Sequence, residues 1–155
     1  MQKYTKPNTD KLDKIPNPLA NTLQIKVSIL KDPHTFKVDG DALIQSSYTV
    51  EADPHCRFYT NPEKRLLMNA ISPQSKELFL WIIYTIEKSK DYIWINKERY
   101  MEELDISSIN TYKKSIDELT RYGVIHITTI KDTYWINPEF FFKGSRIDKY
   151  PNKII

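Results

Sequence analysis

The sequence is poor in the residues that several kinds of functional site require. Its single cysteine, Cys56, cannot form an internal disulfide or an all-cysteine zinc site. Its three glycines do not fit a phosphate-binding loop or a dinucleotide-binding fingerprint. His34, His55 and His126 are scattered, so they do not form the histidine pair that a metal-dependent nickase needs. We therefore expect no catalytic activity, no metal and no other cofactor.

Long hydrophobic runs are missing as well. The longest, Leu78 to Ile83, is far shorter than the roughly 20 apolar residues that a helix needs to cross a bilayer. The N-terminus holds lysines and prolines followed by polar residues, without the hydrophobic centre of a signal peptide. Together with the single cysteine, this predicts a soluble cytoplasmic protein with no membrane partner.

The length and hydrophobic content of the chain predict one compact domain with an appendage. The chain has 155 residues, of which 40% are hydrophobic, enough to bury a real core. A net charge of +3 and an isoelectric point near 8.8 permit a nucleic-acid partner without requiring one.

Composition divides the chain into three segments. Residues 1–21 are rich in Lys, Asp, Asn and Pro and predict a flexible N-terminal arm. Residues 22–60 predict a β-rich segment, because apolar and polar residues alternate and Asp39-Gly40-Asp41 can join two strands. The alternating apolar residues are Leu23, Ile25, Val27 and Ile29, with a further strand expected at Ser47 to Val50. Residues 61–155 then carry strong helix and hairpin signals.

Two Asn/Ser-Pro pairs open helices. Asn61-Pro62 predicts a short helix over 63–69, and Ser72-Pro73 a longer one to about Lys88. The longer helix has a broad apolar side that marks it as the core helix. Because Leu80, Ile83 and Tyr84 are apolar too, we expect it to be covered on more than one side, including by the N-terminal sheet.

The stretch 96–144 has the order of a winged helix-turn-helix, a helix pair followed by a hairpin. Asn96 can cap a helix over 97–104, and Ser108 a second helix that ends at Gly123. The runs 124–130 and 134–142 resemble strands and are separated by Lys131-Asp132-Thr133. A strand over 91–95 should pair with this hairpin. The predicted fold is α+β, with a winged helix-turn-helix after the arm and the β-rich segment.

The second helix of the pair has one apolar and one polar side. Ile109, Tyr112, Ile116 and Leu119 recur every three or four residues and should pack inward. Amide, hydroxyl and ammonium groups early in such a helix reach base edges and phosphates in a major groove. The alternative is an ordinary solvated helix face. The candidate DNA-binding residues are Ser108, Asn110, Thr111, Lys113 and Lys114, with Lys131 at the hairpin tip and Arg146 in the tail on phosphates.

The C-terminal residues leave two questions open. The aromatic residues over 134–142 either complete the core, which we favour, or form a self-association surface, so a homodimer stays open. The tail with Arg146, Lys149 and Lys153 either follows a phosphate backbone or packs back on the domain. His126 is expected to face solvent from the first hairpin strand.

The run YWINPEFFFKGSRIDKYP, from Tyr134 to Pro151, resembles the C-terminal signature of RepL-type plasmid replication proteins. The preceding ISSINTYKKSIDELTRYGVI resembles the recognition helix and hairpin entry of the same family, and the likeness covers about half of the chain. The matching positions are Ser108, Thr111, Lys114, Leu119, Gly123, Asn137, Pro138, Phe140 to Phe142, Lys143 and Gly144.

This resemblance implies a plasmid, phage or other mobile-element protein of the bacterial cytoplasm. Such a protein binds duplex DNA sequence-specifically at a replication origin and recruits replication machinery, with no catalytic residues. A transcriptional regulator would use the same surface, and sequence alone does not separate the two. A third alternative is a structural or interaction protein that retains the fold without binding DNA.

Overall fold

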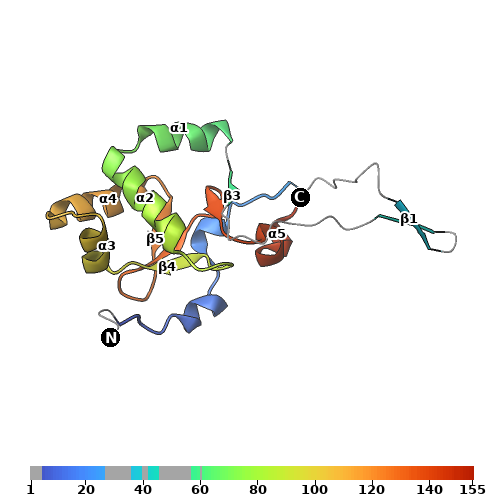
Figure 1. The fold of residues 1–155 in the computed structure, drawn as a ribbon, viewed down its shortest axis with the longest axis horizontal. Coiled ribbons are helices and arrows are strands. Elements are labelled where there is room, and N and C mark those ends of the chain that lie inside the picture. Colours follow the sequence, from blue (N-terminus) through green and yellow to red (C-terminus); the bar gives the residue numbers. More distant parts are fainter. Residues whose placement is uncertain (1–4, 27–35, 40–41, 46–56, 60) are drawn as a thin grey trace.

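The computed structural model of this chain describes residues 5–26, 36–39, 42–45, 57–59 and 61–155. It is an α+β fold in which helices accompany small antiparallel sheets (Figure 1). The helices are η1 (Asp10–Lys14), η2 (Pro18–Ala20), α1 (Pro62–Ala70), α2 (Pro73–Thr85), α3 (Lys97–Glu103), α4 (Ile109–Arg121), α5 (Arg146–Lys149) and η3 (Pro151–Lys153), where η denotes a 3-10 helix. The strands are β1 (Phe36–Asp39), β2 (Ala42–Gln45), β3 (Arg57–Phe58), β4 (Tyr92–Trp94), β5 (Ile125–Ile127), β6 (Thr133–Ile136) and β7 (Phe141–Phe142).

Side-chain caps begin three of the helices where the sequence predicts them. The side chains of Asn61, Ser72 and Asn96 each accept a hydrogen bond from the backbone N–H three residues later. Pro62 and Pro73 occupy the first helical position, where the missing N–H costs nothing. Ser108 stands before α4 as predicted, but its backbone carbonyl rather than its side chain bonds the first turn, at 3.2 Å from Thr111 N.

The expected hairpin forms a three-stranded antiparallel sheet with the order β4-β6-β5. Ile125 pairs with Ile136 across the hairpin, and Tyr92 pairs with Trp135 on its other side. The expected run 134–142 is not one strand, because it breaks at Asn137-Pro138 into β6 and β7. β7 then pairs with β3, which joins the segment before residue 60 to the rest of the fold.

The main core lies between α2, α4 and the sheet. Leu78 and Ile82 of α2 are fully buried, as are Leu119 of α4 and Val124 and Ile125 of β5 and its approach. The aromatic residues over 140–142 are buried as well, which confirms that they complete the core. Tyr134 is partly buried against the same cluster.

The prediction that α2 is covered on more than one side rested on three apolar residues, and it is wrong for two of them. Ile83 is buried, but Leu80 and Tyr84 are exposed. Both point away from the side that packs against α4 and the sheet. An apolar residue next to a buried one on a helix need not share its environment, because adjacent positions differ by about 100° around the axis.

Residues 5–21 differ from the unpacked arm that their composition predicts. Leu12 is buried against Tyr92 and Trp135 of the sheet. Asn17 is buried too, and its Nδ2 donates to the carbonyl of Ile136 at 2.8 Å. Ordering this segment costs conformational entropy, and its polar residues bury too little apolar surface by themselves to offset that cost. Contacts with distant parts of the chain provide the missing stabilisation.

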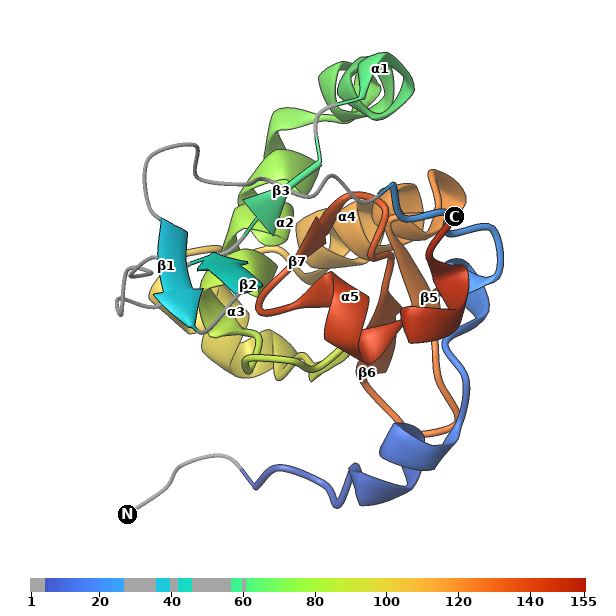
Figure 2. The same cartoon turned by 90° about the vertical axis from the view of Figure 1, so that its right-hand side faces the viewer.

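The N-terminal segment also meets the C-terminal one. Ile25 forms a parallel bridge with Ile154, and Figure 2 shows the blue chain running beside the red C-terminal end. β1 and β2 pair antiparallel, with Asp39 opposite Ala42, as the expected turn between them requires.

Some sequence predictions concern residues that lie outside the described ones. These residues are Val27, Ile29, 47–50, His34, His55 and Cys56. In the described part of the chain, no helix is both long enough and apolar enough to cross a membrane.

Candidate nucleic-acid interface

α4 follows α3 through a tight turn. Asp105 adopts a left-handed backbone conformation with φ of 52°, and the N–H of Ile106 donates to the carbonyl of Met101 at 2.8 Å. Ile106 itself packs against the core, as expected for a residue that fills the angle between two helices. The turn therefore fixes the direction in which α4 leaves α3.

One side of α4 is committed to the core. Tyr112, Ser115, Ile116 and Leu119 are buried, and Ser115 Oγ donates to the Thr111 carbonyl at 3.0 Å. Ile109, which was expected to belong to this side, is exposed at the start of the helix. The packing of the other three predicted residues is confirmed.

The opposite side of α4 faces solvent and carries the predicted polar residues. Lys113 and Lys114 are exposed, and neither forms an ion pair within the described part of the chain. Thr111 is half-buried beside the start of α2, where it lines a small hollow together with Lys114. The structure thus brings together Ser108, Asn110, Thr111, Lys113 and Lys114 on the first two turns of one helix.

Sequence analysis missed one cation on this side. Arg121, in the last turn of α4, is exposed and lies seven positions after Lys114, which places it on the same side of the helix. The signal for it in the sequence is its helical spacing from Lys114. Asp117 lies between them and adds a negative charge.

Two carboxylates near this surface are held by the protein itself. Glu103 accepts hydrogen bonds from Trp81 Nε1 and Arg99 Nε, both at 2.7 Å, and these bonds lower the pKa of its carboxyl. Glu118 accepts from the Ser72 N–H at 2.5 Å, which lowers its pKa in the same way. Both carboxylates therefore stay ionised, and Arg99 balances the charge of Glu103.

The tip of the β5–β6 hairpin presents Lys131, which is exposed. Thr128 Oγ1 donates to the Thr133 carbonyl at 2.8 Å and braces the turn. Asp132 adopts a φ of 56°, and its carbonyl accepts from Ile95 N at 2.8 Å, next to β4. His126 is exposed on β5, as predicted.

Arg146 does not join the α4 residues, which corrects the prediction of a phosphate contact there. Its guanidinium lies 3.5 Å from the centre of the Tyr59 ring, and its Nη1 donates to the Pro138 carbonyl at 3.0 Å. The side chain is half-buried, and this burial lowers its pKa. In Figure 1, α5 lies across the main body of the fold from α4. Arg146 therefore packs against its own chain and is not part of the candidate interface.

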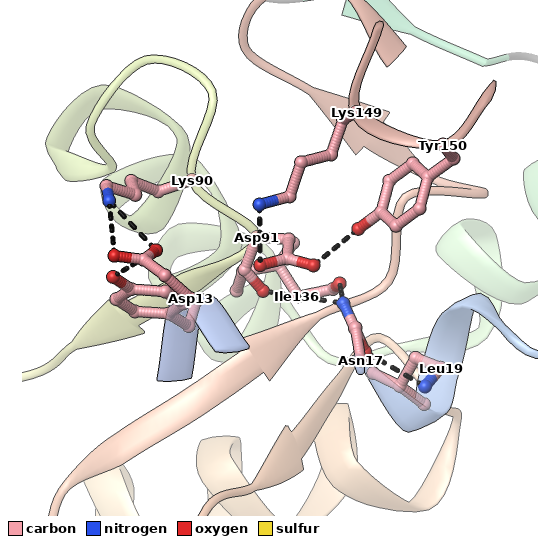
Figure 3. Close-up of polar contacts among 9 residues, drawn as sticks. Asp13, Asn17, Leu19, Lys90, Asp91, Ile136, Lys149 and Tyr150 are labelled. Atoms are coloured by element: carbon pink, nitrogen blue, oxygen red, sulfur yellow. Dashed lines mark hydrogen bonds and ion pairs between the residues drawn. The ribbon is translucent and has the colours of Figure 1, made fainter. Parts of the chain in front are cut away.

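The rest of the tail packs back on the domain as well. Tyr150 is buried, and its hydroxyl donates to Asp91 Oδ2 at 2.5 Å, beside Lys149 at 3.8 Å from the same carboxylate (Figure 3). Burial first, and the Asp91 charge second, raise the pKa of Tyr150. Lys153 Nζ donates to the Asn21 carbonyl at 3.2 Å. Of the two alternatives for the tail, packing against the domain is the one that the structure contains.

The described residues contain no group of three histidines, cysteines or carboxylates close enough to hold a metal ion. What the surface of α4 offers is a set of exposed hydrogen-bond donors and three cations, Lys113, Lys114 and Arg121, on a well-packed helix. Such an arrangement suits recognition of a polyanion rather than a covalent reaction. No family profile, characterised protein or solved structure matches this chain.

Proposed function

We propose that the protein binds duplex DNA through a winged helix-turn-helix made of α2, α3, α4 and the β5–β6 hairpin. In this arrangement α4 enters the major groove, and the hairpin tip with Lys131 follows the phosphate backbone. The proposal rests on one observation above the others. α4 buries Tyr112, Ile116 and Leu119 on one side and leaves Asn110, Lys113 and Lys114 exposed on the other.

Each of these side chains has a partner in a groove. An asparagine amide matches the donor and acceptor pair of adenine, and a lysine ammonium donates to guanine or to a phosphate oxygen. The amides of the first turn of α4 point toward the same space as Ser108, and a helix N-terminus attracts a phosphate. Arg121 extends the basic side of the helix by two turns.

We propose that the role of this binding is to recognise a replication origin. The support is the resemblance of residues 134–151 to RepL-type plasmid replication proteins, which implies a plasmid or phage source and a partnership with replication machinery. A winged-helix transcriptional regulator is the competing role, because it needs the same surface. Mapping of the bound sites separates the two, since an initiator occupies an origin in or beside its own gene and a regulator occupies promoters.

Binding itself is tested with a pool of duplexes whose centre is randomised. The selected duplex is titrated by fluorescence anisotropy against the wild-type chain and the Lys113→Ala/Lys114→Ala variant. We expect the variant to bind at least about tenfold more weakly, since one good contact to a base contributes roughly 1–3 kcal/mol. Its melting temperature should stay nearly unchanged, because both side chains are exposed.

Lys11→Ala/Lys88→Ala is the matched control, because it removes the same charge from two exposed lysines outside α4. For the wild type, the logarithm of the affinity should fall with that of the salt concentration, by about 0.9 per phosphate contacted. Removing two phosphate contacts should reduce that slope by about 2. A flat salt response, or equal affinity of the α4 variant and the control, would reject DNA binding by this surface.

A further inference from the structure

An apolar groove lies between α1, α2 and β3. Its volume is about 700 Å³, and Met68, Phe79 and Phe140 line it, with Phe58 and Leu80 among its other walls. None of the lining residues belongs to α4 or to the β5–β6 hairpin. The groove is therefore separate from the polar side of α4.

Exposed apolar side chains gather on the elements around this groove. Phe58 and Leu80 are each 51% exposed, Leu66 of α1 is 69% exposed and Tyr84 of α2 is 84% exposed. Tyr84 follows Leu80 by one helical turn and so continues its side of α2. Single exposed apolar residues are common on protein surfaces, whereas Phe58 and Leu80 line one groove together, as at a binding surface.

α1 is incompletely packed in this structure. It has nine residues and none of them is buried, although Leu67 and Met68 are partly buried against the core. An isolated helix of this length is only marginally stable in water, since most helical stability in proteins comes from the packing of an apolar face. A partner segment laid against α1 would supply the missing contacts.

The charge of the groove indicates the chemistry of the partner. Lys64, Arg65 and Lys76 line it, and its lining contains no carboxylate. Lys64 is paired with Glu139 at 2.9 Å, whereas Arg65 and Lys76 form no ion pair within the described residues. An apolar floor with an uncompensated basic rim complements a segment that is apolar on one side and acidic on the other.

We propose that this groove binds an acidic amphipathic helix of a partner protein. The helix lays its apolar side chains over Phe58, Met68 and Leu80, and its carboxylates meet Arg65 and Lys76. Single-stranded nucleic acid fits less well, because successive bases stack on several open rings. Of the phenylalanines in the lining only Phe58 is exposed, whereas Phe79 and Phe140 are almost completely buried. The groove gives the protein a second surface, distinct from the one on α4.

The test is a selection of random peptides displayed on phage against the full chain. The enriched peptides should carry a net negative charge, with apolar residues at helical spacing. Their affinity, measured by fluorescence anisotropy, should fall at least about tenfold in the Arg65→Glu/Lys76→Glu variant, a change of about 1.4 kcal/mol. Leu80→Ser should weaken the same peptides, and all three side chains are exposed, so the fold should tolerate the changes.

Lys11→Glu/Lys88→Glu makes the same change of net charge away from the groove and should leave peptide binding within about twofold. The Arg65→Glu/Lys76→Glu variant should also bind the selected duplex like that control, which keeps this test separate from that of α4. Absence of enrichment, or enriched peptides that are neutral, basic or indifferent to the groove variant, would overturn the proposal. Binding of oligothymidine that the groove variant abolishes would overturn it in favour of nucleic acid. If the chain sediments as a dimer and the Leu80→Ser variant sediments as a monomer, the proposal is overturned in favour of a second copy of this chain.

Discussion

Replacing Tyr150 by phenylalanine removes one hydroxyl from the buried polar group of Figure 3 and leaves the aromatic ring in place. That hydroxyl donates to Asp91 Oδ2 at 2.5 Å, and among the described residues the Asp91 carboxylate then keeps one ion pair, with Lys149 at 3.8 Å. Loss of a hydrogen bond to a charged, buried acceptor costs roughly 1.5–3 kcal/mol. The contact of the ring with Phe142, 6.1 Å between centres, is retained, so the cost should come from the hydroxyl alone.

For a chain of this size, 1 kcal/mol corresponds to about 2–4 °C, so the melting temperature should fall by about 3–12 °C. The assay is thermal unfolding followed by circular dichroism at neutral pH. Tyr84→Phe is the control, since it makes the same chemical change at an exposed tyrosine and should shift the free energy of unfolding by less than about 0.5 kcal/mol. If Tyr150→Phe melts like Tyr84→Phe, the reasoning about Asp91 is refuted. A double-mutant cycle with Asp91→Asn should give a coupling of roughly 0.5–3 kcal/mol.

Two further predictions concern the core. Leu119→Ala should destabilise the fold by roughly 2–5 kcal/mol, because this fully buried side chain packs between α4 and α2; urea unfolding measures it, and a cost below 1 kcal/mol would contradict the packing. Burial raises the pKa of Tyr100 to about 12, against about 10 in an unfolded chain. The neutral side chain therefore stabilises the fold fully below about pH 10, and this contribution is lost as the pH rises toward 12. Burial raises the pKa of Tyr134 and Tyr150 in the same direction. The melting temperature should thus fall steadily above about pH 10 and fall less in Tyr100→Phe, and a melting temperature independent of pH in this range would contradict it.

Local signals in the sequence were sufficient to place the helix starts. Asn61, Ser72 and Asn96 cap their helices through bonds that span only three residues, so the signal for each cap lies in the local sequence. The packed side of α4 was readable for the same reason, since its spacing reflects one regular element. The hairpin after Gly123 followed from two apolar runs and a turn-prone interval, and the structure confirms it.

Features that depend on distant contacts were not readable in the same way. Leu12 stands among charged residues, and only the presence of Tyr92 and Trp135, far along the chain, explains its burial. Arg146 has the sequence context of a free tail cation, yet Tyr59 and Pro138 engage it. Leu80 and Tyr84 show the opposite error, because apolar character alone does not specify which elements will cover a side chain.

The bridge between Ile25 and Ile154 bears on the order in which the chain can fold during translation. Ala20, Leu23 and Ile25 leave the ribosome well before Phe142 and Tyr150, which are the other buried members of their cluster. The hydrogen bond between Lys153 and Asn21 joins residues 132 positions apart, and closing so long a loop is slow. These three apolar residues therefore stay unburied until the segment that holds Phe142 and Tyr150 has been synthesised.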